Sequence, residues 1–385
     1  MAIPYPHKHL LLLVLWFASC VGGGALKSES GPESEHCITQ SPSYAKNFAI
    51  TRFPTHRIIT AQTIQANSAL RSQYALVPRD SPLPELPEDI TVIRTPVERV
   101  VVLETVHLGY LEALDKLDTI IGAANTNYIS NEFIRERVKD GSVRQVQIGT
   151  SLNIERLLLQ KPDLILTSIP TDQSAGISTR LLHAGLPVVL TTEYKEQHLL
   201  ARAEWIKFIA EFFDATATAN EYFTRIAARY ESLCSKVSNV RTRPTVFCGA
   251  PYSGIWHIAR GESYIAQAIK DAGGHYLWEN VPGSDVIPLD TERVFLKAAR
   301  ADVWINPSFY RSLNALFGAD PRFQKFHATR MGKVYNNTRQ QRNDTGNPIW
   351  ETGVVHPDNV LADLIKIFHP DRMPDWEFSY YEQLQ

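Results

Sequence analysis

The sequence predicts an α/β protein in which two lobes, each built on a parallel β-sheet, are joined by one long helix and preceded by a small β segment. Near-continuous apolar strands alternate with amphipathic helices from residue 98 onward. A stretch without strand signal follows over residues 200–238, and the alternation resumes after Pro244. Buried strands that alternate with amphipathic helices are typical of a parallel sheet covered on both faces.

The composition of this 385-residue chain argues against several classes of protein. With 44% hydrophobic and 21% charged residues, the chain has an ordinary globular composition, which argues against wholesale disorder. The net charge of −2 gives no reason to expect a nucleic acid partner. The four cysteines, Cys20, Cys37, Cys234 and Cys248, form no CxxC pair, so neither a structural zinc site nor a disulfide framework is expected.

Residues 1–19 are predicted to be an export signal. Leu10–Phe17 is an apolar run that follows Lys8 and is too short to cross a bilayer. The string Phe17-Ala18-Ser19-Cys20 resembles a bacterial lipobox, so we expect Cys20 to carry the lipid that anchors the protein to a membrane; a simply cleaved signal is the alternative. Residues 20–46 are rich in Gly, Ser, Glu and Pro and are expected to be a flexible tether.

The body is predicted to contain four parts. Residues 47–97 are expected to be a β appendage, because they hold short strand-like runs separated by turn residues such as Pro54-Thr55-His56. Lobe one is expected over 98–193, and lobe two with a C-terminal tail over 244–385. The linking helices lie between, over 194–243. Thr218 and Glu221 predict a capping box at the start of the long helix, which we expect to act as a strut.

Two segments of the chain resemble each other. Leu152-Asn153-Ile154-Glu155-Arg156 and Leu289-Asp290-Thr291-Glu292-Arg293 each predict an N-capped helix that leads into a buried strand. An acid in a first helical turn gains about 0.3–1 kcal/mol from the helix dipole, which alone accounts for either glutamate. The alternative is that two exposed carboxylates, one per lobe, bind an arginine on each half of a dimeric partner.

From about residue 98 to 370 the chain resembles the helix-linked solute-binding proteins of the vitamin B12 and ferric siderophore ABC importers. The segments that carry the resemblance are ERVVVLE, LNIERLLLQKPDLIL, DAGGHYLWEN and LDTERVFLKAARADVWIN. The tail from YNNTRQQRNDTG to LADLIKIFHP also resembles a Bacteroidetes-type branch that handles iron complexes. The resemblance implies two Rossmann-like lobes joined by a rigid helix, with the ligand between them. It also implies a periplasmic protein whose Glu155 and Glu292 dock on arginines of an ABC permease dimer.

Candidate ligand contacts lie in the loops that follow the predicted strands, because ligands of open α/β sheets bind beyond the carboxyl ends of the strands. The candidates are aromatic or basic, and they are Tyr128, Tyr252, Trp256, Arg260, Arg339 and Trp350. Such residues suit a large ligand with apolar faces and anionic edges, although each alone is more often a packing residue.

Direct metal binding would require three or four converging ligands, and His107, Glu193 and His257 are the candidate set. A lone histidine is more often structural. We therefore expect neither a resident metal nor a cofactor.

A binding protein that feeds an ABC importer is the first interpretation, with a ferric siderophore or haem as its ligand and cobalamin as the alternative. An enzyme is not expected, because the sequence has no GxSxG, HExxH or glycine-rich phosphate loop. A surface haemophore that passes its ligand to a receptor is the third class. Charge reversal at Glu155 and Glu292 distinguishes the permease interpretation from the haemophore interpretation. If the protein docks on a permease, the reversal abolishes uptake while ligand binding is preserved.

Overall fold

The computed structural model describes residues 37–65, 68–88, 90–148, 151–168, 180–342 and 346–385, all within one compact unit, His36–Gln385. The predicted export signal, the lipidation site Cys20 and most of the predicted tether lie outside the described residues. Among the helices of the described part, none is long and apolar enough to cross a membrane.

A five-stranded sheet opens the described chain, in the order β1-β2-β3-β4-β5. Its strands are β1 Ile38–Gln40, β2 Phe48–Arg52, β3 Arg57–Gln65, β4 Ser68–Pro78 and β5 Thr91–Thr95. The predicted turn at residues 54–56 joins β2 to β3, whereas β5 runs parallel to β4. Because β1 pairs with β2, residues 38–40 belong to the sheet and not to the tether predicted over residues 20–46.

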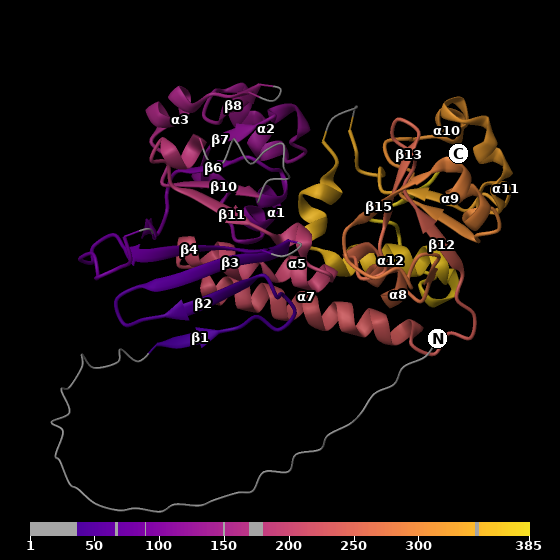
Figure 1. The fold of residues 1–385 in the computed structure, drawn as a ribbon, viewed down its shortest axis with the longest axis horizontal. Helices are drawn as coiled ribbons and strands as arrows, with labels where there is room; N and C mark the ends of the chain where they lie inside the picture. Colours follow the sequence, from indigo (N-terminus) through magenta and orange to yellow (C-terminus); the bar gives the residue numbers. More distant parts are fainter. Residues whose placement is uncertain (1–36, 66–67, 89, 149–150, 169–179, 343–345) are drawn as a thin grey trace, which may run out of the picture. The chain divides into compact units, whose positions relative to one another are not determined.

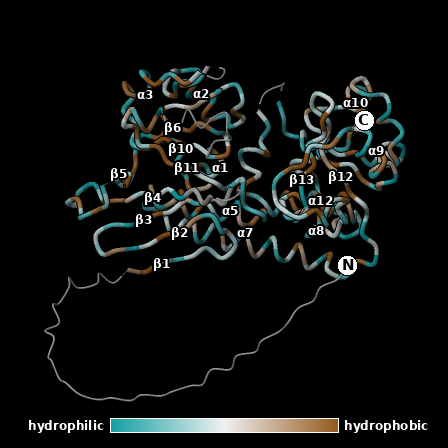
Figure 2. The backbone as a smooth tube through the Cα atoms, in the orientation of Figure 1, coloured by the Kyte–Doolittle hydropathy of each residue, from teal (hydrophilic) through white to brown (hydrophobic). Residues whose placement is uncertain are grey.

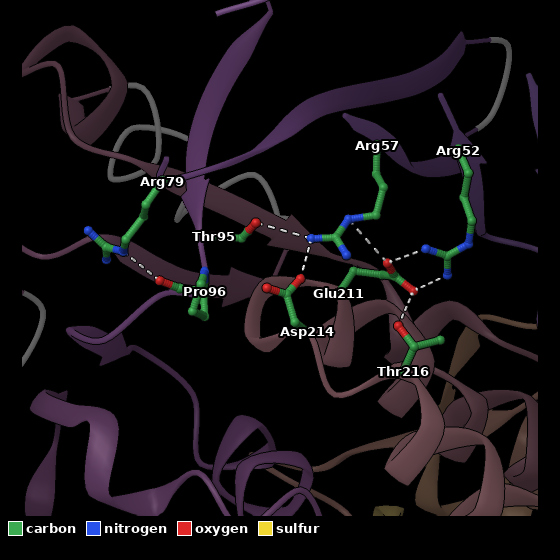
Figure 3. Close-up of polar contacts among 8 residues, drawn as sticks. All are labelled: Arg52, Arg57, Arg79, Thr95, Pro96, Glu211, Asp214 and Thr216. Carbon is green, nitrogen blue, oxygen red and sulfur yellow. Dashed lines mark hydrogen bonds and ion pairs between the residues drawn. The ribbon is translucent and has the colours of Figure 1, made fainter. Parts of the chain in front are cut away.

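The N-terminal sheet is fixed to the linking helices by buried acids (Figure 3). The Glu211 carboxylate is fully buried and lies 2.5 Å from the Arg52 guanidinium and 3.6 Å from that of Arg57. The Thr216 hydroxyl donates a further hydrogen bond to Glu211. A buried carboxylate is stable only when it is paired. The ion pairs of Glu211 with Arg52 and Arg57 therefore fix the position of the sheet against the linking helices.

Two more buried glutamates secure the chain that leads into β2. Glu204 accepts the backbone N–H groups of residues 43–45 at 2.7–2.9 Å. Glu196 accepts those of residues 46 and 47, together with the indole N–H of Trp205. Phe48 packs edge-on against Trp205, so apolar contact accompanies the polar contacts. The segment expected as an appendage therefore shares the core of the linking helices.

Lobe one is built on a six-stranded sheet of order β11-β10-β6-β7-β8-β9, parallel except for β9. The strands are β6 Val100–Val102, β7 Ile120–Ala124, β8 Arg144–Ile148, β9 Ser151–Leu152, β10 Leu164–Ser168 and β11 Val188–Thr191. Its helices include α1 Val106–Ala113, α2 Glu132–Lys139 and α3 Ile154–Gln160. The central strands are hydrophobic and buried over residues 100–102 of β6 and 164–166 of β10, which confirms the predicted covered parallel sheet (Figure 2).

The linking helices are α5 Leu199–Glu204, α6 Ile206–Ala210 and the 22-residue α7 Thr216–Val237, which leads to β12 (Figure 1). The predicted capping box at Thr218 and Glu221 is wrong, because α7 begins at Thr216 and Thr218 lies inside it. Asp214, two residues before α7, has a left-handed backbone (φ 53°) that ends the short helix η4 Glu211–Phe213 and turns the chain into α7.

Lobe two contains a five-stranded sheet of order β14-β12-β16-β17-β18 and a separate antiparallel pair, β13 with β15. The strands are β12 Thr245–Cys248, β13 Ile255–Ala259, β14 His275–Tyr276, β15 Val286–Asp290, β16 Val303–Ile305, β17 Val334–Asn336 and β18 Glu382–Gln383. The helices are α8 Tyr264–Asp271, α9 Thr291–Ala298, α10 Leu313–Ala319, α11 His327–Arg330 and α12 Pro357–Phe368. The molecule thus has the predicted two-lobed α/β architecture.

Candidate ligand-binding site

A cleft of about 620 Å³ is lined by both lobes, at the carboxyl ends of their parallel strands. Lobe one contributes Thr105, which follows β6, and Tyr128, which lies on the short helix η2 Thr126–Tyr128 after β7. Lobe two contributes the larger share of the lining through the loops after β12, β16 and β17. This is the place where ligands bind in open α/β sheets.

Three aromatic side chains of the lining are largely exposed. Tyr128, Phe309 and Trp350 have exposed fractions of 58%, 64% and 51%. Exposed aromatic rings in a concave site offer flat apolar surface that a ligand can cover. The structure therefore places two of the candidate residues, Tyr128 and Trp350, on the cleft and adds Phe309.

Amide side chains make up most of the polar lining, namely Asn306, Asn336, Asn337, Gln341 and Asn347. The Asn336 amide donates hydrogen bonds to the carbonyl oxygens of Ser308 (2.8 Å) and Tyr310 (2.7 Å). Asn347 donates to the carbonyl oxygen of Asn337 at 3.0 Å. These bonds fix the loops after β16 and β17 relative to each other, so the cleft wall is held in shape before any ligand arrives.

A second hollow of about 480 Å³ adjoins the first, and the two share Gln341 and Gly346 in their lining. It contains three arginines, Arg135, Arg339 and Arg342, and one acid, Glu132. One ion pair joins two of these four residues, Arg342 and Glu132, at 3.5 Å. The hollow is therefore basic, which suits carboxylate or other anionic groups.

The cleft-edge segment, residues 346–351, crosses from lobe two to lobe one. The carboxylate of Glu351 accepts the backbone N–H groups of Ser130 (2.6 Å) and Asn131 (3.1 Å). Glu351 is only 2% exposed, and burial raises its pKa to about 7 despite these two hydrogen bonds. A Cβ on Gly346 would lie 2.6 Å from the carbonyl oxygen of Tyr128. Glycine at this position therefore allows the cleft-edge segment to approach the backbone of lobe one.

Three candidate ligand contacts lie elsewhere. Trp256 is fully buried, and its indole N–H donates to the carbonyl oxygen of Cys248, so the expectation that it contacts ligand is wrong. Trp256 lies on β13, and its side chain packs in the aromatic core beside Trp304 and Phe247. Arg260 pairs with Asp285 at 2.7 Å, and neither Arg260 nor the exposed Tyr252 lines the two hollows.

No cluster of three or more His, Cys, Asp or Glu side chains that could hold a metal ion occurs among the described residues. His107, Glu193 and His257 are therefore not assembled into a metal site. His107 is fully buried, its Nε2 lies 3.1 Å from the Thr191 hydroxyl, and burial lowers its pKa to about 4. A neutral buried histidine of this kind has a structural role in lobe one.

The two candidate docking acids occupy matching positions. Asn153 caps α3 through a 2.8 Å bond to the Arg156 N–H, and Asp290 caps α9 through a 2.7 Å bond to the Arg293 N–H. Glu155 and Glu292 lie in the first turns of these helices and are exposed. Glu292 also pairs with Arg322 at 2.7 Å, and the hydrogen bond from Arg322 lowers the Glu292 pKa.

Residues 100–340, which run from β6 to β17, match the family model described as "Periplasmic binding protein". The chain belongs to this family. The matched range begins at β6, so the N-terminal sheet of this periplasmic binding protein lies outside it.

Two similar relatives are uncharacterized lipoproteins of Methanocaldococcus jannaschii. One is 24% identical over 362 residues, covering 88% of this chain and 84% of the relative. The other is 25% identical over 329 residues, covering 82% of this chain and 80% of the relative.

Solved structures show the same fold at low identity. A periplasmic heme binding protein from Pseudomonas aeruginosa has a TM-score of 0.55 at 15% identity, covering 71% of this chain and 93% of that one. A possible iron-binding protein from Staphylococcus epidermidis has a TM-score of 0.54 at 18% identity, covering 71% and 99%. An ABC-type Fe3+-hydroxamate transport system structure from Saccharomonospora viridis has a TM-score of 0.50 at 17% identity, covering 68% and 93%.

Arg135, Phe309 and Asn347 of this periplasmic binding protein were not predicted at the ligand site from the sequence. Arg135 lies within the amphipathic helix α2, where an arginine normally covers a solvated face. Phe309 directly follows the loop Asn306-Pro307-Ser308, so its position after a predicted buried strand was the available signal.

Proposed function

We propose that this chain is the extracytoplasmic solute-binding lipoprotein of an ABC importer, and that it captures a bulky, anionic iron complex between its lobes and delivers it to a permease. The ligand class is a ferric siderophore or haem. The observation that carries the proposal is the arginine-containing hollow that continues the aromatic and amide-lined cleft.

The size and chemistry of the two hollows support a large ligand. Sites for small molecules commonly measure about 300–1,000 Å³, so the main cleft alone fits a substantial ligand and the adjoining hollow extends it. Tyr128, Phe309 and Trp350 suit the apolar faces of such a ligand. Arg135 and Arg339 suit its negatively charged edge, since guanidinium groups bind carboxylates with two parallel hydrogen bonds.

The similar proteins also support an iron complex as the ligand. Structures with this fold are described as binding heme, as possibly iron-binding and as part of Fe3+-hydroxamate transport, and two relatives are lipoproteins. The 22-residue helix α7 between the lobes supports assignment to the helix-linked class of importer-binding proteins. The resemblance of the C-terminal tail is what favours an iron-complex branch of the kind found in Bacteroidetes. The lipid anchor belongs to the proposal and is assigned to Cys20.

A direct test uses the purified protein with haemin, a carboxylate-bearing ferric siderophore and cyanocobalamin. Each mixture is desalted, and visible absorbance reports the ligand retained. We expect retention of haemin or the ferric siderophore. Retention of cyanocobalamin alone would replace the iron-complex proposal with the alternative, and retention of none would contradict the cleft assignment.

Paired variants test the role of the basic hollow. The double substitution Arg135→Gln with Arg339→Gln should weaken binding of the retained ligand by at least tenfold, because charge-assisted hydrogen bonds contribute about 1.5–3 kcal/mol each. Arg241→Gln removes an exposed arginine from the loop after α7 and serves as the matched control. Equal affinity in the double variant and the control would show that the ligand does not use the hollow.

A further inference from the structure

The helices α3 and α9 carry a glutamate, an arginine and a leucine at matching places, one set in each lobe. Each has a side-chain N-cap, Asn153 or Asp290, and a glutamate two residues later. Each helix leads into an inner strand of its parallel sheet, β10 in lobe one and β16 in lobe two. The permease docking expected from the sequence involves only the glutamates of these helices.

A leucine lies one helical turn beyond each glutamate, and both leucines are almost fully exposed. Leu159 and Leu296 have exposed fractions of 84% each, the highest among the large exposed hydrophobic residues of the described chain. Residues four apart on a helix share one face, so Leu159 lies beside Glu155 and Leu296 beside Glu292. One exposed leucine on a protein surface is ordinary, but the same leucine at the same place in two lobes is not accounted for by chance scatter.

The neighbouring arginines are held by their own lobes. Arg156 donates to the carbonyl oxygen of Gln145 at 2.8 Å, and Arg293 lies 3.2 Å from Asp290. Each helix therefore presents an exposed acid and an exposed apolar side chain. The Glu292 carboxylate is also paired with Arg322 of its own lobe at 2.7 Å, so a basic group of the partner has to share or replace that contact. The charge that complements such a surface is positive, and it must lie beside an apolar hollow that receives the leucine.

We infer that Glu155 with Leu159 and Glu292 with Leu296 form two equivalent docking pairs, each made of an acid and an apolar anchor. The partner is a membrane protein with two equivalent halves, each presenting a basic side chain next to an apolar hollow. This inference rests on the proposed function, in which that partner is the permease dimer. The glutamates set orientation and the leucines supply buried apolar area in the complex.

Photo-crosslinking tests the contact in native membranes. A benzoylphenylalanine residue replaces Leu159, Leu296 or, as a control, Leu83, which is 58% exposed in a proline-rich segment outside both helices. We expect positions 159 and 296 to crosslink to one membrane protein, identified by mass spectrometry as an ABC permease, and position 83 not to do so. Crosslinks to any other protein, or equal crosslinking at position 83, would overturn the inference.

Affinity for the identified permease–ATPase complex, purified in lipid nanodiscs, separates the leucines from the acids. Leu159→Ser and Leu296→Ser should each weaken binding about tenfold, as loss of a buried leucine predicts. Leu83→Ser should bind as the wild type does. If Glu155→Gln and Glu292→Gln weaken binding but the leucine variants do not, the inference fails while the proposed function stands. If the wild-type protein does not bind the complex, both fail.

Discussion

Glu351 joins the C-terminal part of the chain to lobe one at the edge of the ligand cleft. Its buried carboxylate accepts two backbone N–H groups beside Tyr128, which lines the cleft. Desolvation outweighs these bonds and raises its pKa from 4.5 to about 7. A carboxyl group with a raised pKa stabilises the fold fully below its unfolded pKa, and this contribution is lost as pH rises through the folded pKa.

Raising the pH from 5 to 8 should lower the melting temperature of the Glu351→Gln variant less than that of the wild type. The amide keeps an acceptor oxygen but does not ionise, and the wild-type contribution is at most about 3 kcal/mol for a shift of this size. Differential scanning calorimetry at both pH values measures the decrease. The exposed control Glu136→Gln should behave as the wild type does, and a Glu351→Gln variant with an unchanged decrease would contradict the assignment.

The identity of individual ligand contacts was only partly predictable from the residues. Tyr128, Arg339 and Trp350 lie in loops at the carboxyl ends of strands, as expected, and the structure places them on the two hollows. Trp256 was taken for a loop residue because it follows the strand that contains Cys248. It instead lies on β13, where alternation turns Trp256 and Ile258 inward and His257 outward.

At the scale of elements, the strands of both parallel sheets could be predicted because they are short apolar runs. Leu164–Ser168 and Val188–Thr191, for example, lie within the runs DLILTS and PVVLTTE. The pair of β13 and β15 could not be predicted, because no turn joins the two strands and residues 260–285 separate them. Such pairing depends on tertiary contact, which a local pattern does not encode.

The attachment of the N-terminal sheet could not be predicted either. Arg52 and Arg57 belong to adjacent strands, and their acid Glu211 lies more than 150 residues later in the sequence. Sequence reasoning therefore treated these strands as an appendage. The structure shows instead that the buried acids Glu196, Glu204 and Glu211 bind the first part of the chain to the linking helices.

Glu211→Gln should reduce the free energy of unfolding by about 3 kcal/mol, because it removes the acid of Arg52 and leaves Arg57 with the exposed Asp214 alone. Urea unfolding followed by tryptophan fluorescence measures the change. Glu136→Gln, which breaks an exposed ion pair with Lys139, should cost less than about 1 kcal/mol. Equal losses in the two variants would show that the Glu211 contacts do not fix the sheet.

At the scale of the whole molecule, three separate parts of the chain build the ligand site. Lobe one supplies Tyr128 and Arg135, and the loops of lobe two supply most of the amides. The cleft-edge segment supplies Trp350, and Glu351 holds this segment against lobe one. The two docking pairs lie on other helices, α3 and α9, neither of which lines the main cleft. Ligand capture and partner recognition are therefore separable by substitution.

The measurement that tests this account most directly is a crystal structure of the protein loaded with the ligand it retains after desalting. We predict one ligand per chain, in contact with Tyr128 of lobe one and Trp350 of the cleft-edge segment. An anionic group of the ligand should lie within hydrogen-bond distance of Arg135 or Arg339. A ligand bound outside this cleft, or in contact with one lobe alone, would contradict the account.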